Sequence, residues 1–97
     1  MTICEILQKI EENRDRIREF GVGRIGVFGS ASRGEALSDS DLDILVELEK
    51  ETFRAYMGLK FFLEELFDRR VDLVLVDTIK PRFRESILSE VKYAEGL

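Results

Sequence analysis

Residues 42–48 read LDILVEL, and this short run decides the fold expected for the sequence. Alternate side chains of a β-strand share a face, so the even-numbered residues of the run point to one side and the odd-numbered residues to the other. The even-numbered set is wholly apolar and is predicted to face the core. It consists of Leu42, Ile44, Val46 and Leu48.

Two further runs have the same apolar, β-branched character, namely RIGVF at 24–28 and VDLVLV at 71–76. They predict two more strands. Apolar residues recur with helical spacing in three other segments, predicted to be helices over residues 2–20, 52–67 and 81–91. The expected order is α-β-β-α-β-α in a single domain spanning residues 1–97. This order predicts an α+β fold, with a small mixed three-stranded sheet and the helices packed on one face.

Each predicted helix has its own start or stop signal. Thr2 and Glu5 form a capping-box pair, Gly21 ends the first helix, and Pro81 suits the first turn of the last. The side chains expected to face inward follow the helical period. In the second helix they are Phe53, Tyr56, Met57, Phe62, Leu63, Leu66 and Phe67, and in the third Phe83, Ile87, Leu88 and Val91.

The glycines of GVGRIG, residues 21–26, match the spacing of a dinucleotide-binding turn. That turn must follow a strand and open a helix, because the pyrophosphate rests on the helix N-terminus. Here the order is reversed, with a helix before the glycines and a strand after them. We therefore predict a helix stop at Gly21 and a close backbone approach at Gly26.

Composition excludes several classes of function. The 97 residues carry a net charge of −5, which argues against direct nucleic-acid binding, since phosphate affinity comes from Lys and Arg. No histidine is present, which rules out imidazole catalysis and histidine-ligated zinc. The one cysteine, Cys4, is expected on the buried side of the first helix, and it allows no disulfide framework. We expect a cytoplasmic protein without a membrane-spanning segment.

Three carboxylates are predicted to converge at one end of the sheet. Asp41 and Asp43 share the face of the second strand that points away from the helices, and Asp72 is the second residue of the third strand. If the two strands are neighbours, the three negative charges repel one another unless a cation lies among them. Mg²⁺ or Mn²⁺ is the ion that such oxygen ligands favour.

A turn suited to phosphate precedes these carboxylates. Gly29 allows close backbone approach, and the Ser30 hydroxyl with nearby amides could hold phosphate oxygens. Arg33 could add a cationic donor. The turn and the carboxylates together predict a metal-nucleotide site, whereas each aspartate alone would more simply be a solvent-facing residue.

The stretch FGSASRGEALSDSDLDILVEL, residues 28–48, resembles the minimal nucleotidyltransferases, the MNT group of the polymerase beta-like nucleotidyltransferases. The resemblance continues through VDLVLV and the PRFRESILSEV helix. It implies a palm-like fold in which Asp41 and Asp43 are the metal-binding pair and Asp72 is the third catalytic carboxylate. It also implies that Gly29 and Ser30 hold the triphosphate of a nucleotide, with ATP expected as the substrate.

The same resemblance implies a biological role. Members of the MNT group act as antitoxins by adenylylating a tyrosine of a HEPN-domain ribonuclease toxin, so such a toxin is the expected partner. Two alternatives stay open at this point. The chain could neutralise a HEPN toxin by contact alone, without catalysis, or it could transfer a nucleotide to a small molecule. Self-association and assembly with the partner are both open.

Overall fold

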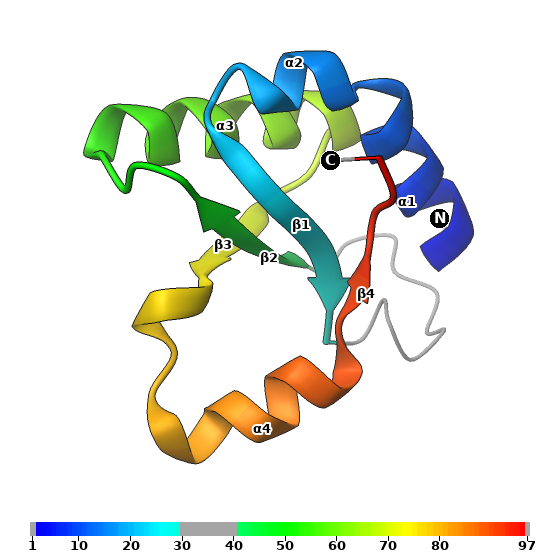
Figure 1. Ribbon diagram of the computed structural model, residues 1–97. Helices are drawn as coiled ribbons and strands as arrows, with labels where there is room; N and C mark the ends of the chain where they lie inside the picture. The colour runs from blue at the N-terminus through cyan, green and yellow to red at the C-terminus, as the bar shows by residue number, and fades with distance from the viewer. Residues whose placement is uncertain (1, 30–40, 97) are drawn as a thin grey trace.

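The structure is a computed structural model that describes residues 2–29 and 41–96 (Figure 1). Its helices and strands follow one another in the order expected from the sequence, with short elements added. They are α1 (Ile3–Glu12), α2 (Arg14–Arg18), β1 (Val22–Phe28), β2 (Leu42–Leu48), α3 (Phe53–Phe67), β3 (Val71–Leu75), the 3₁₀ helix η2 (Val76–Thr78), α4 (Pro81–Glu90) and β4 (Lys92–Tyr93). No helix in the described part of the chain has the length and apolar character needed to span a bilayer.

The strands form a mixed sheet in the order β3-β2-β1-β4. β1 is antiparallel to both β2 and β4, whereas β2 and β3 are parallel. The α+β class with a mixed sheet is therefore confirmed. The expected number of strands was too small, because the two-residue strand β4 pairs with β1 and extends the sheet. A pairing of two residues has no periodicity that a sequence pattern could reveal.

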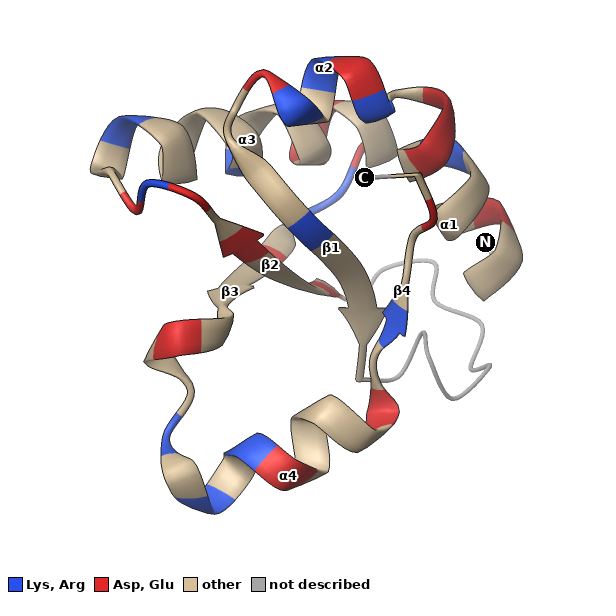
Figure 2. Cartoon of the chain, viewed as in Figure 1, with Lys and Arg blue, Asp and Glu red and all other residues tan. Residues whose placement is uncertain are grey.

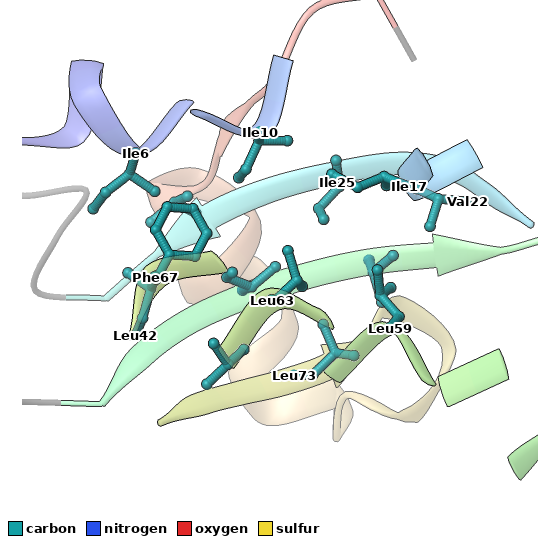
Figure 3. Close-up of a cluster of buried hydrophobic side chains, with 14 of the residues drawn as sticks. Ile6, Ile10, Ile17, Val22, Ile25, Leu42, Leu59, Leu63, Phe67 and Leu73 are labelled. Carbon is teal, nitrogen blue, oxygen red and sulfur yellow. The ribbon is translucent and has the colours of Figure 1, made fainter. Parts of the chain in front are cut away.

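The main core lies between one face of the sheet and the layer formed by α1, α2 and α3 (Figure 3). The inward set of β2 predicted from alternation is buried here, as are Ile25 and Val27 of β1. From the helices, the buried side chains are Ile6, Ile10, Ile17, Leu59, Leu63 and Phe67. Amphipathic stripes of this kind provide most of the stability of a small α+β domain.

Helix α4 packs on the opposite face of the sheet, which corrects the expectation that all helices share one face (Figure 1). A second, smaller cluster holds it there, built on buried Phe28, Leu45 and Val76. The partly buried side chains Ile87, Leu88 and Val91 pack against this cluster, as their helical spacing predicted. Leu45 lies on the face of β2 that alternation assigned to solvent, and α4 covers it.

The first helix is interrupted at Asn13, so the single helix predicted over residues 2–20 is wrong in this detail. The Asn13 side chain donates a hydrogen bond to the Lys9 carbonyl oxygen at 2.8 Å. Asparagine competes in this way for backbone groups, and here it separates α1 from α2. The predicted capping box of Thr2 and Glu5 is present at the start of α1.

Two of the predicted glycine roles are confirmed. Gly21 has a φ of +84° just after α2, a backbone conformation that glycine adopts without strain. A Cβ placed on Gly26 would lie 2.8 Å from both the Lys92 carbonyl oxygen and a Val91 methyl group. Only glycine therefore lets β4 approach β1 at this point.

Several side chains expected in the core are exposed instead. Phe53 is 80% exposed and Phe83 is 48% exposed, and Cys4 lies on the surface. Each of these residues lies in the first turn of its helix. A side chain there has fewer packing neighbours than one in the middle of the helix, so the helical period overestimates its burial. Leu59 was not among the predicted core residues, yet it is fully buried.

Candidate functional site

The candidate site lies at the end of the sheet where β1 stops and where β2 and β3 begin. Phe28, the last residue of β1, pairs with Asp43 of β2, and Asp43 pairs in turn with Asp72 of β3. Side chains of paired residues in neighbouring strands project from the same face of a sheet. The structure therefore brings Asp43 and Asp72 together, as the sequence predicted, on the face that also carries α4.

Gly29 shapes the wall of this site directly. Its φ is +72°, in the left-handed region that favours glycine. A Cβ at this position would lie 2.2 Å from the Oδ2 atom of Asp43, well inside any ordinary contact distance. The backbone at Gly29 and the Asp43 carboxylate thus lie close together, and any residue with a Cβ at this position would force the carboxylate to move.

Asp41 stands immediately before β2, two residues ahead of Asp43. The following residue, Leu42, donates its backbone N–H to the Arg70 carbonyl oxygen at 2.9 Å, which ties the start of β2 to the start of β3. Asp41 and Asp72 are exposed, and Asp43 is half-buried. An exposed pair beside a half-buried carboxylate leaves the site accessible to a ligand from solution.

The start of β3 is held by a glutamate of α3. The Glu64 Oε2 atom accepts hydrogen bonds from the Val71 backbone N–H at 3.0 Å and from the Lys60 ammonium at 2.9 Å. The Val71 hydrogen bond, with smaller help from Lys60, lowers the pKa of the Glu64 carboxyl below its ordinary value. Because Val71 precedes Asp72, this charged anchor fixes the strand end that carries the third carboxylate.

The three aspartates are chemically suited to a hard divalent cation, since carboxylate oxygens are the ligands that Mg²⁺ and Mn²⁺ prefer. The register places Asp43 and Asp72 side by side, and Asp41 stands immediately before β2. Within residues 2–29 and 41–96, no three acidic or cysteine side chains are already gathered closely enough to enclose a metal ion. The backbone is in place for the site, and the carboxylates would have to turn toward a shared ion.

Two of the predicted phosphate-binding residues, Ser30 and Arg33, lie outside the described residues. Their assignment remains a prediction from the sequence. Gly29, the third member of that group, is described and adjoins the carboxylates at the end of β1.

Sequence reasoning missed the position of α4 relative to the carboxylates. Asp43 and Asp72 were expected on a face free of helices, whereas α4 packs on that face against Phe28, Leu45 and Val76. A signal was available in Leu45 and Val74, which are apolar residues on the same face as the two aspartates. Apolar residues on both faces of a strand indicate that both faces are covered.

Comparisons with known proteins identify relatives of this chain. A sequence model of the nucleotidyltransferase domain family matches residues 3–94. A protein of Thermococcus cleftensis named protein adenylyltransferase MntA is 42% identical over 95 residues, which cover 96% of each chain. The high coverage of both chains means that the likeness extends over the strands, the helices and the motif between them.

Solved structures show the same likeness. A structure of a candidate minimal nucleotidyltransferase has a TM-score of 0.81 and 39% identity and covers 95% of each chain. A complex of a tri-AMPylated Shewanella oneidensis HEPN toxin with its MNT antitoxin contains a chain with a TM-score of 0.66 and 23% identity. The match covers 94% of the present chain and 73% of that one, and at this identity it demonstrates a shared fold alone.

The resemblance inferred from residues 28–48 is thus confirmed by matches that extend over nearly the whole sequence. On the evidence of the family match to residues 3–94 and of the relative at 42% identity, this chain belongs to the nucleotidyltransferase domain family.

Proposed function

We propose that this chain is a metal-dependent protein adenylyltransferase that transfers AMP from ATP to a tyrosine hydroxyl of a HEPN-domain toxin and thereby acts as an antitoxin. The observation that carries the proposal is the direct pairing of Asp43 with Asp72 at the end of β1. The Thermococcus relative, named as a protein adenylyltransferase, supports the reaction class. The complex of an AMPylated HEPN toxin with an MNT antitoxin supports the partner.

Each carboxylate has a proposed part in the transfer. Asp41 and Asp43 would hold the divalent ion together with Asp72, and that ion supplies positive charge opposite the triphosphate and the acceptor oxygen. Asp72 is exposed at the edge of the site and is our candidate to orient the acceptor hydroxyl and receive its proton. In the reaction the hydroxyl oxygen bonds to the α-phosphorus, and the bond from that phosphorus to pyrophosphate breaks.

The turn after β1 is proposed to hold the phosphate tail. Gly29 adjoins the Asp43 carboxylate, since a Cβ on Gly29 would lie 2.2 Å from the Asp43 Oδ2 atom. Ser30 and Arg33 follow it in the sequence and are proposed to donate hydrogen bonds to the phosphate oxygens. Because ATP and a reducing interior are both found in the cytoplasm, we propose that the protein acts there.

The test is transfer of label from ATP. The purified chain is incubated with α-labelled ATP, Mg²⁺ and the protein encoded by the neighbouring gene, which we propose is a HEPN-domain toxin, and label on that protein is followed together with its ribonuclease activity. We expect a labelled tyrosine and a loss of ribonuclease activity. Asp43→Asn and Asp72→Asn should each lower the labelling rate by at least ~10³-fold, because the acceptor and the triphosphate lose their charged contacts.

Asp15→Asn is the matched control, since the Asp15 side chain on α2 is 96% exposed and lies outside the site. It should label the toxin at the unaltered rate. Neutralisation that survives both site variants without any transferred label would instead identify a binding module. Label on a small-molecule acceptor, with none on the toxin, would reject the protein acceptor.

A further inference from the structure

An apolar groove lies at the outer edge of the sheet, between β3 and the start of α3, away from the three aspartates. Its volume is about 320 Å³, and its apolar walls are Phe53, Tyr56, Leu73 and Leu75. β3 is the edge strand of the sheet, and the Tyr56 hydroxyl donates a hydrogen bond to the Leu73 carbonyl oxygen at 2.5 Å. Phe53, at 80% exposure, is the most exposed large apolar side chain of the described residues. An exposed aromatic side chain beside an apolar groove is typical of an interaction surface.

The rim of this groove is acidic. Glu51, Thr52 and Thr78 complete its lining. Glu51 also lines an adjoining hollow of about 130 Å³ together with Glu47 and Asp77. A hydrogen bond between the carboxyls of Glu51 and Asp77, with smaller contributions from desolvation and repulsion, raises the pKa of Glu51 above its ordinary value. A cation brought to this rim from outside would relieve the repulsion.

The start of α4 carries an exposed aromatic side chain together with basic residues. Phe83 is 48% exposed, and the Arg82 guanidinium lies 4.7 Å from the centre of its ring. Lys80 is exposed just before the helix, and neither Lys80 nor Arg82 makes a salt bridge within residues 2–29 and 41–96. Figure 2 shows basic segments at the start of α4 and an acidic segment in the connection between β3 and α4.

We propose that the groove receives Phe83 of a second copy of this chain, with Lys80 and Arg82 of that copy placed against Glu51 and Asp77. The aromatic side chain is apolar, like the walls of the groove. The two cations carry the charge opposite to that of the acidic rim. Complementary potentials of this sort set the register and the orientation of an interface.

The positions of the two surfaces favour a closed dimer. Thr78 lines the groove, and α4 begins at Pro81, so a short connection joins the groove to the aromatic residue. Phe83 is not among the residues that line the groove of its own chain. Two copies related by a twofold axis would exchange the same contact reciprocally, which closes the assembly at two chains. β3 carries Asp72, so the dimer contact would lie on the strand that supplies the third carboxylate.

Sedimentation velocity on the purified full chain tests the proposal without any knowledge of its substrate. We expect a shift from monomer to dimer as the concentration rises from about 5 µM to about 500 µM, the range suited to a small, polar-rimmed interface. The dimer should weaken when salt is raised from roughly 50 mM to roughly 500 mM, since the ionic contacts are screened. A chain that stays monomeric at the highest concentration in low salt overturns the proposal.

Substitutions locate the interface. Phe83→Ala should raise the dissociation constant at least ~10-fold, as expected for a buried aromatic anchor. Phe61→Ala is the matched control, because Phe61 is 59% exposed on α3 and lines neither surface. It should leave the dissociation constant unchanged. Equal effects of the two substitutions would reject Phe83 as the anchor.

A charge exchange separates a specific contact from a general effect of charge. Glu51→Arg and Arg82→Glu should each weaken the dimer, and the double variant should restore it, because each new glutamate then meets a new arginine. Both positions are exposed, so circular dichroism should show an unaltered fold. Failure of the double variant to recover dimerisation overturns the pairing. Loss of binding to the HEPN-domain protein in Phe53→Ala, with the free chain monomeric, would assign the groove to that partner instead.

Discussion

Gly29→Ala is the substitution for which the structure makes the sharpest prediction, because two independent penalties meet at this residue. The backbone there has a φ of +72°, which costs a residue with a Cβ roughly 1–2 kcal/mol. The new methyl group would also lie 2.2 Å from the Asp43 Oδ2 atom. The first penalty acts on stability alone, whereas the second displaces a carboxylate of the candidate site.

The size of the displacement follows from the geometry. Ordinary contact begins at 3.4 Å, so the Asp43 oxygen and the methyl group must separate by about 1.2 Å. A shift of about 1 Å in a positioned catalytic group lowers rates by roughly 100-fold. Alanine also reduces the conformational entropy of the unfolded chain relative to glycine. This effect stabilises the folded state by about 0.4–1 kcal/mol and offsets part of the backbone penalty. We therefore expect a modest loss of stability and a loss of at least ~100-fold in nucleotidyl transfer.

Gly21→Ala is the matched control. Its φ of +84° imposes the same kind of backbone strain, but a Cβ there would meet no atom within 4 Å. Urea unfolding measures the stability of both variants, and transfer of label from ATP measures activity. A separate readout is the rise in melting temperature caused by Mg²⁺ and ATP, which requires no acceptor.

Both variants should lose stability, with the larger loss in Gly29→Ala, and only Gly29→Ala should lose the response to Mg²⁺ and ATP. If Gly29→Ala retains both the transfer rate and that response, the contact between Gly29 and Asp43 has no part in the site. If Gly21→Ala is equally impaired in activity, the effect comes from backbone strain and not from the displaced carboxylate.

Three further substitutions test the charges. Mg²⁺ alone should raise the melting temperature of the parent chain and not of Asp72→Asn; an equal rise in both, by differential scanning fluorimetry, contradicts the metal assignment. The lowered pKa of Glu64 means that its contribution to stability is present above about pH 4.5 and is lost as the pH falls through the folded-state pKa. Glu64→Gln should remove that acid-dependent loss in urea titrations, and an unaltered pH profile would reject the anchor on Val71. The raised pKa of Glu51 has the opposite effect, because stability falls as the pH rises through the folded-state pKa. Glu51→Gln should flatten this decline in stability, whereas a steeper decline in the variant would contradict the contact with Asp77.

Much of the candidate site could be predicted from local patterns. Asp43 lies on the face of β2 predicted for it because alternation is a property of the strand itself, and Asp41 stands immediately before that strand. The prediction that Asp72 lies beside them assumed that β2 and β3 are neighbours. The parallel register of the two strands confirms that assumption. The requirement for glycine at position 29 was expected, but its reason, the contact with the Asp43 carboxylate, depends on the pairing of β1 with β2.

The sequence by itself determined the identity and order of the main helices and strands, the buried face of β2 and the type of chemistry, because periodicity and side-chain chemistry are local properties. Only the tertiary structure decided that α4 covers the face bearing the carboxylates, that β4 extends the sheet, and that Phe53 and Phe83 remain exposed. These features arise from contacts between residues far apart in the chain. Hydrophobic burial is not directional, so an apolar stripe indicates that a side chain will be covered without specifying which surface covers it.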